Sequence, residues 1–185
     1  MKMSFSKEIS NLLYAMESNP IDRCIQCGTC SATCPVAEFM DYSPREIIEM
    51  IRGNFKKEVL SSNTIWYCAS CYHCTVKCPE GINITDMMYA LKRYSIWKNC
   101  YKKSLIGPNF SKKFIRGIMK SGKSFEPALA PTFIFKYGLR SLLDDSFMGY
   151  ALWRKGRMPF IPSEIKRKRN FQRVIGRIIP IGRFS

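Results

Sequence analysis

Acidic residues are scarce in this chain of 185 residues, where 14 Asp and Glu stand against 30 Lys and Arg, a formal net charge of +16. The shortage is uneven. Residues 1–86 hold eight basic and ten acidic residues, a net charge of −2, whereas residues 87–185 hold 22 basic and four acidic residues, a net charge of +18. This asymmetry indicates a basic arm that meets an acidic partner protein, nucleic acid or an anionic membrane.

Long apolar runs are also missing. No run approaches the length of about 18 residues that predicts a membrane-spanning helix. The opening segment MKMSFSKEISNLLYAMESNP is interrupted by Glu and Asn, and no small-residue cleavage site follows it, so it is not a signal peptide. We therefore expect a cytoplasmic protein, in which disulfides are rare and clustered cysteines usually bind metal or do chemistry.

Catalytic motifs are absent as well. The sequence offers no nucleophile–base pair, no phosphate-binding loop and no flavin or nicotinamide fingerprint, so we expect no substrate chemistry on this chain. Its single histidine, His73, lies inside a cysteine cluster. There it is either a metal ligand or, as the cysteines around it favour, a packing residue or one that tunes a metal bound by them.

Period-two strand patterns are few, and the spacing of apolar residues predicts a mostly α fold. The best-marked helix begins at Ser43, with Pro44 at the first helical position, Glu46 completing a capping box and Gly53 as the stop. Gly107-Pro108 is read as a break. The other expected helices are Ser6–Met16, Phe55–Leu60, Thr85–Lys103, Thr132–Leu143 and Ser163–Ile179.

We expect two parts, a cysteine-rich helical domain over residues 1–105 and a basic helical extension over 106–185 that docks to a partner. The extension ends in a basic amphipathic segment that would lie in a partner's groove or on a membrane surface. Lys166–Arg169 could instead bind nucleic acid, but no aromatic platform or nucleic-acid fold motif accompanies it, so no nucleic-acid partner is expected. The apolar face of this segment contains Phe171, Val174, Ile175 and Ile178.

The strongest pattern is an internal repeat with the spacing Cys-x2-Cys-x2-Cys-x3-Cys-Pro. The cysteines of its two copies are Cys24, Cys27, Cys30 and Cys34, and Cys68, Cys71, Cys74 and Cys78. The ninth cysteine, Cys100, lies on the predicted long helix, where a small buried hydrophobe is expected rather than a reactive thiol.

Three cysteines at this spacing on a tight, partly helical turn bring their thiolates around one corner of a compact metal site. The restricted backbone at proline directs the fourth cysteine away from that corner. An iron–sulfur cubane needs four such ligands. Structural zinc sites use two separated pairs, which leaves the third cysteine and both Cys-Pro steps unexplained. A disulfide framework would leave one thiol over.

The run resembles that of bacterial ferredoxins, in which the fourth cysteine binds the other cluster. That resemblance implies two 4Fe–4S clusters with exchanged fourth ligands. One cluster would be held by Cys24, Cys27, Cys30 and Cys78, and the other by Cys68, Cys71, Cys74 and Cys34.

From about Ile21 to Tyr94 the chain resembles the C subunit of heterodisulfide reductase from methanogens. The resemblance is carried by both cysteine runs together with Tyr42-Ser43-Pro44-Arg45, Trp66-Tyr67-Cys68 and Cys78-Pro79-Glu80-Gly81. It implies an α-helical ferredoxin that relays electrons from the flavin-bearing A subunit to the B subunit, which reduces the mixed disulfide of coenzyme M and coenzyme B. Related modules serve other anaerobic dehydrogenases, usually fused to domains with a Cys-Cys-Gly motif. This chain has no Cys-Cys pair, so the catalytic cysteine-rich part is expected on another chain.

Overall fold

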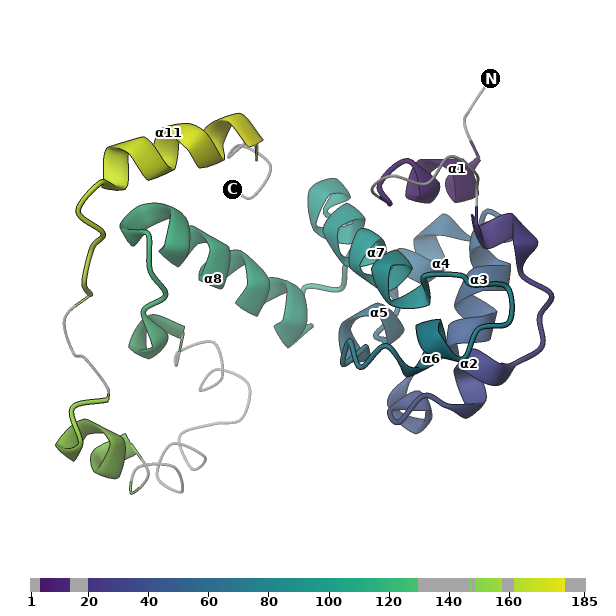
Figure 1. Cartoon of the computed structure of the whole chain (residues 1–185), viewed down its shortest axis with the longest axis horizontal. Helices are drawn as coiled ribbons and strands as arrows, with labels where there is room; N and C mark the ends of the chain where they lie inside the picture. Colours follow the sequence, from purple (N-terminus) through teal and green to yellow (C-terminus); the bar gives the residue numbers. More distant parts are fainter. Residues whose placement is uncertain (1–3, 14–19, 130–146, 148, 158–161, 179–185) are drawn as a thin grey trace. The chain divides into compact units, whose positions relative to one another are not determined.

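A computed structural model describes residues 4–13, 20–129, 147, 149–157 and 162–178 (Figure 1). Its contacts divide the chain into two units, Met1–Leu105 and Ile106–Ser185. The described residues contain helices and no strand, so the prediction of a mostly α fold is confirmed. The role of the second unit in docking stays a prediction.

The first unit consists of short helices around one longer helix, α7. Its elements are α1 (Phe5–Ser10), η1 (Pro20–Arg23), α2 (Thr29–Ala32), η2 (Ala37–Phe39), α3 (Pro44–Arg52), α4 (Lys56–Ser61), α5 (Thr64–Tyr67), α6 (His73–Val76) and α7 (Ile84–Lys98). Helices α1, α4, α5 and α6 all contact α7, and α2 contacts α6.

Helix α3 forms as its sequence predicts. The Ser43 backbone N–H donates to the Glu46 carboxylate at 2.7 Å, the return half of a capping box, and Gly53 is the C-cap. These contacts satisfy backbone groups that the first turn of a helix leaves without partners. Ile47, Ile48 and Ile51 form an apolar stripe on this helix that is fully buried.

The apolar faces of α1, α3, α4 and α7 meet in one core. Met87, Met88, Leu91 and Tyr94 of α7 point inward, and each is less than 5 % exposed. A polar contact lies within this packing, where Lys56 Nζ pairs with Glu8 Oε2 at 2.6 Å and the Tyr94 hydroxyl donates to the same oxygen. The ammonium group also lies 4.7 Å from the centre of the Tyr94 ring. This network ties α1 and α4 to α7.

Two expected helix ends are wrong. The first helix ends at Ser10 rather than Met16; residues 14–19 lie outside the described residues. Helix α7 ends at Lys98 because Asn99 adopts the left-handed conformation, with φ 54°. Asn tolerates that region better than most residues and commonly ends helices there. Cys100 therefore follows the helix, and its exposed side chain corrects the expectation of a buried hydrophobe.

The second unit contains α8 (Ile106–Ser121), η3 (Glu126–Leu129) and α11 (Lys168–Ile178). Helix α8 includes the Gly107-Pro108 step that the sequence pattern predicted to be a break. The step falls in the first turn, where a missing N–H costs nothing because no partner is available to it. The expected helix Thr132–Leu143 lies outside the described residues.

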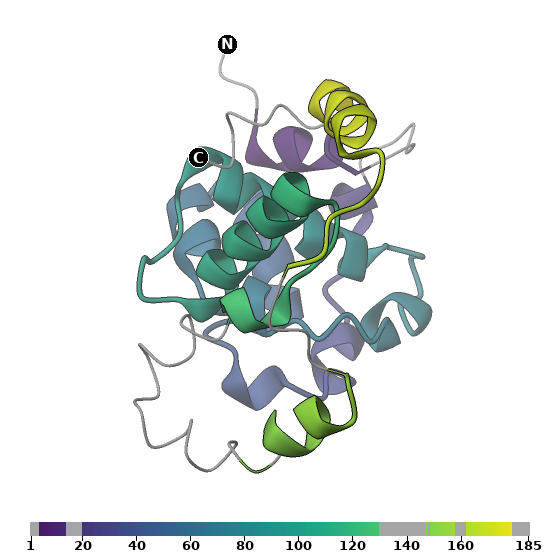
Figure 2. The same cartoon turned by 90° about the vertical axis from the view of Figure 1, so that its left-hand side faces the viewer.

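Helices α8 and α11 lie side by side in both views of the second unit (Figures 1 and 2). Gln172 Nε2 donates to the Met119 carbonyl at 3.0 Å, and the Ile165 N–H donates to Ser121 O at 3.1 Å. Phe171 and Ile175 are half-buried, whereas Val174 is 56 % exposed. The amphipathic tail thus begins its helix at Lys168 rather than Ser163, and it contacts its own unit.

Candidate metal centre

The two cysteine runs fold alike. Each is a loop that enters one short helix, α2 in the first run and α6 in the second. Left-handed backbone occurs at matching positions in both loops, at Gln26 and Gly28 (φ 57° and 81°) and at Ser70 and Tyr72 (φ 58° and 63°). Three of these four residues are not glycine and carry a conformational cost. Left-handed residues in such loops can turn backbone N–H groups toward one concave side, an arrangement that favours anions such as iron–sulfur clusters.

The first run lines a cavity that is partly open to solvent, with a contribution from the second run. Apolar side chains, among them Ile48, Ile82 and Ile84, form part of its wall. The cysteines that line it are Cys24, Cys27, Cys30 and Cys78.

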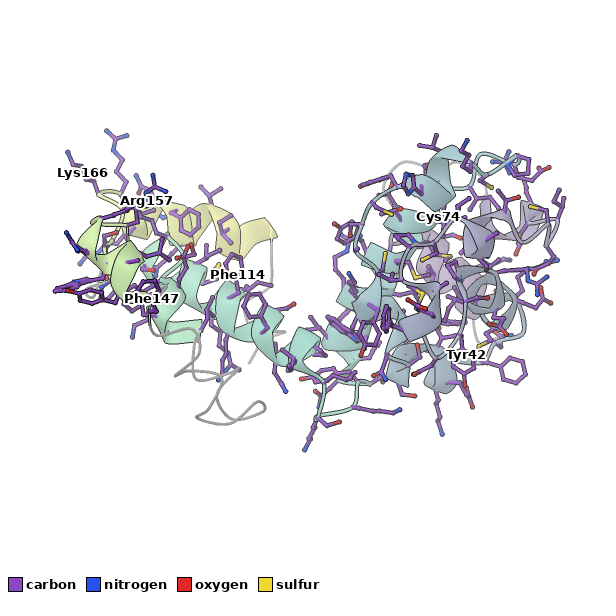
Figure 3. All side chains as sticks on the ribbon, turned by 90° about the horizontal axis from the view of Figure 1, so that it is seen from below. Tyr42, Cys74, Phe114, Phe147, Arg157 and Lys166 are labelled. Carbon is purple, nitrogen blue, oxygen red and sulfur yellow. The ribbon has the colours of Figure 1, made fainter. Side chains whose placement is uncertain are left out.

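The second run lines a cavity that is partly open to solvent and whose wall includes Met40, Ile84 and Met88. The cysteines that line it are Cys34, Cys68, Cys71 and Cys74. The structure therefore brings the fourth cysteine of each run to the three leading cysteines of the other. Sulfur atoms gather around the labelled Cys74 (Figure 3).

This donor set fits a cluster better than a single ion. No three His, Cys, Asp or Glu side chains in the described part of the chain converge as ligands of one metal ion, whereas four cysteines surround each of the two cavities. All nine cysteines are free of disulfides. Four cysteines around each cavity match the one ligand per iron that a 4Fe–4S cluster requires.

The cysteines differ in their surroundings. Cys27 and Cys71 hold the same position in the two runs, and both are exposed, so each cavity has one cysteine at the surface. Burial raises the pKa of the Cys30 thiol and of the Cys34 thiol. Hydrogen bonds from the Thr29 hydroxyl and N–H lower the pKa of Cys27, because they stabilise its thiolate.

Several polar contacts to the cysteine runs are not evident from the cysteine spacing. Cys24 Sγ accepts from Gln26 Nε2 at 3.5 Å, and Cys27 Sγ lies 3.4 Å from Thr29 Oγ1. In the second run, Cys74 Sγ lies 3.7 Å from Thr85 Oγ1. The only sequence signal for these contacts is a hydroxyl or amide within or just after a run. Hydrogen bonds to ligating sulfurs tune cluster potentials.

Cations also reach the runs. Arg52 Nη1 donates to the Cys24 carbonyl at 3.2 Å, and Lys92 Nζ donates to the Cys68 carbonyl at 3.0 Å. Arg45 lines the first cavity, and so does the acidic Glu80. Sequence reasoning missed Arg52 and Lys92, which lie on helices that follow each run.

His73 is exposed at the start of α6 and lines neither cavity. Of the aromatic residues near the second run, Tyr72 lines its cavity, Trp66 packs against the core, and Tyr67 is 51 % exposed. No described helix combines the length and apolar character needed to cross a membrane.

Comparison with known proteins agrees with this geometry. Residues 20–82 match the family described as "4Fe-4S dicluster domain". The chain is 44 % identical over 80 residues to the C subunit of ferredoxin:CoB-CoM heterodisulfide reductase from Methanosarcina acetivorans, covering 43 % of this chain and 32 % of that protein. It is 34 % identical over 87 residues to the C subunit of H(2):CoB-CoM heterodisulfide,ferredoxin reductase from Methanothermobacter marburgensis, covering 47 % of each.

A third relative is the C subunit of ferredoxin:CoB-CoM heterodisulfide reductase from Methanosarcina mazei, 37 % identical over 93 residues, which cover 50 % of this chain and 56 % of the relative. The matched part thus spans about a third to a half of these proteins. The match favours iron–sulfur clusters over the zinc and disulfide alternatives. The chain carries a 4Fe–4S dicluster domain that binds two 4Fe–4S clusters, and this part of it is similar to the C subunit of heterodisulfide reductase.

Proposed function

We propose that the clusters have exchanged ligands. The observation that supports this assignment is the pair of cavities, each lined by three cysteines of one run and the fourth of the other. The proposed ligands are Cys24, Cys27, Cys30 and Cys78 for the first cluster, and Cys68, Cys71, Cys74 and Cys34 for the second.

We further propose that the chain is the electron-transfer subunit of a cytoplasmic heterodisulfide reductase complex. It would relay electrons from the flavin-bearing A subunit to the catalytic B subunit, which reduces the heterodisulfide of coenzyme M and coenzyme B. The single observation that carries this role is the similarity to the C subunits of such complexes across the cysteine runs. The clusters, when bound, supply one-electron oxidation and reduction.

The residues of the chain suit a relay. Four cysteines in each set fill the ligand positions of a cluster, so a substrate sulfur finds no open iron site, and disulfide reduction belongs to another subunit. Apolar walls, including Ile48 in one cavity and Met88 in the other, limit access of water. Exposed Cys27 and Cys71 bring an edge of each site to the surface, where a partner's redox centre can approach.

The test compares two electron donors to a reconstituted complex of this chain, a reduced flavoprotein and a cysteine-rich catalytic subunit. In Cys27→Ser and Cys71→Ser complexes, flavoprotein-driven reduction of the heterodisulfide should fall, while reduction driven by an artificial dye that feeds the catalytic subunit should persist. Cys100→Ser, outside both cavities, is the matched control. Equal loss with both donors would place this chain in the chemistry itself, and no loss with either would exclude it as the relay.

A second candidate is the iron–sulfur subunit of another anaerobic dehydrogenase. It is favoured by one observation, that the unit Ile106–Ser185 lies outside the matched dicluster domain and so could select a different partner. Native purification separates the two candidates, because only the first predicts copurification with subunits that reduce the heterodisulfide.

A further inference from the structure

In each run, the backbone carbonyl of the first cysteine accepts a hydrogen bond from a cationic side chain. Arg52 Nη1 donates to Cys24 O at 3.2 Å, and Lys92 Nζ donates to Cys68 O at 3.0 Å. Cys24 and Cys68 hold the same position in the repeat, and each cation comes from the first helix of more than six residues after its run, α3 or α7. The contact is therefore part of the repeated unit, although the cations differ.

Each contact can act on its run in two ways. The carbonyl lies just ahead of the left-handed turn that begins two residues later, at Gln26 or Ser70. A cation bound there fixes where the loop starts and hence where its first thiolate lies. It also holds a positive charge beside a site that gains a negative charge on reduction, and nearby positive charge favours the more negative state.

We infer that Arg52 and Lys92 are paired positioning residues, each of which raises the reduction potential of the cluster bound by its own run. The inference rests on the binding of two clusters by the two runs. It does not depend on which run supplies the fourth ligand, because Cys24 and Cys68 belong to their own runs in either arrangement.

The two cations should differ in strength. Arg52 is exposed, and its charge is offset by Glu49, whose Oε2 lies 3.2 Å from Nη1. The first cavity is also lined by two other charged side chains, Glu80 and Arg45. The charge of Arg52 is therefore a smaller share of the charge that acts on the first-run cluster. Lys92 is half-buried, and among the described residues it makes no ion pair. No charged side chain lines the second cavity within the same part of the chain. Lys92 should therefore dominate.

The experiment is a redox titration of the anaerobic full-length protein, with each cluster followed by its electron paramagnetic resonance signal. The signals are assigned beforehand by the changes that Cys27→Ser and Cys71→Ser produce. In Lys92→Met, the reduction equilibrium of the second-run cluster should shift toward the oxidised form about tenfold, which equals a fall of about 59 mV for one electron. The first-run cluster should keep its potential.

Three variants complete the design. Lys92→Arg, which keeps the charge, should retain the wild-type potential, and Arg52→Met should lower only the first-run potential, by less than Lys92→Met lowers the second. Lys98→Met removes the same charge from the same helix, where Lys98 Nζ lies 5.2 Å from the ring centre of Trp97. This variant should shift the reduction potential of neither cluster. If the Lys92→Met protein loses its second-run cluster, the potential is measured in Lys92→Gln, which keeps a hydrogen-bond donor but loses the charge.

The inference is overturned if Lys92→Gln or Lys92→Met leaves the potential of an intact second-run cluster unchanged. It is equally overturned if Lys98→Met causes the same shift, or if Lys92→Met shifts both clusters alike. None of these outcomes bears on the relay, which is measured separately by turnover.

Discussion

The two units of the chain solve different problems. Met1–Leu105 contains the buried core of Ile9, Ile47, Leu60, Leu91 and their neighbours, and it carries 13 basic and ten acidic residues. Ile106–Ser185 carries 17 basic and four acidic residues, and its only buried side chains in the described ranges are Pro108 and Ser121. The first unit therefore has an interior that can hold a cofactor site in place. The second unit has a high net positive charge and few buried side chains among its described residues, which suits a surface that binds other molecules.

All nine cysteines lie in the first unit. Replacement of the fourth cysteine of either run should therefore have the largest effect of the changes predicted below. Cys78→Ser should change the same resonance signal as Cys27→Ser, and Cys34→Ser the same signal as Cys71→Ser. Where a serine replacement releases its cluster, iron should fall from about eight to about four atoms per chain. Iron and sulfide analysis with spectroscopy measures both. A Cys78→Ser spectrum that matches Cys71→Ser would show that each run serves its own cluster.

The core of the first unit should respond to truncation far more than the second unit does. Ile47→Ala removes a fully buried side chain and should lower the free energy of unfolding by about 2–5 kcal/mol. Val174→Ala on α11, 56 % exposed, should change it by less than about 0.5 kcal/mol. Denaturant unfolding followed by circular dichroism tests the pair. Equal losses of unfolding free energy in the two variants would mean that packing in the second unit contributes as much to stability as packing in the first.

The Glu8 network should contribute a smaller amount. Burial raises the pKa of Glu8, but hydrogen bonds from Lys56 and Tyr94 outweigh it and hold the pKa below its ordinary value of 4.5. The carboxylate therefore stabilises the fold above that value, and the contribution is lost as the pH falls through the lowered pKa of the folded state. Glu8→Gln should cost about 1.5 kcal/mol at neutral pH.

Unfolding of Glu8→Gln and the wild type across pH checks this sign. The difference between them should be constant between about pH 6 and 8 and narrow in more acid solution. A difference that widens on acidification would contradict the assigned direction.

The smallest expected effect tests the second unit. Deletion of residues 163–185 removes seven basic residues and one acidic residue. It should slow association with the partner subunits about tenfold at low salt, and less as salt screens the charge. Both clusters should stay intact, as iron content will show. Unchanged association, or tight binding of the full chain to DNA at physiological salt, would mean that the basic unit serves another purpose.

Local signals in the sequence predicted much of the first unit. The capping box of Ser43 and Glu46 acts within one helix, so neighbouring residues suffice to determine it. The repeat predicted the cluster-binding chemistry for the same reason. Arg52 and Lys92 were missed because their contacts lie 28 and 24 residues from the carbonyls they reach. The prediction of a break at Pro108 was wrong because the cost of proline depends on its position in a helix, and only the structure shows where α8 begins.

The sharing of each cavity between the two runs has a consequence for the topology of the chain. With ligands exchanged as proposed, one cluster joins Cys24 to Cys78, which are 54 positions apart in the sequence. Inside the loop that this closes, the other cluster joins Cys34 to Cys68, which are 34 positions apart. Each closure restricts the unfolded chain as a disulfide of that span does, by about 4 kcal/mol of conformational entropy. Loss of the first cluster would then remove the restriction on nearly the whole unfolded segment between the first and last cysteine, whereas loss of the second would remove only that on the shorter inner loop.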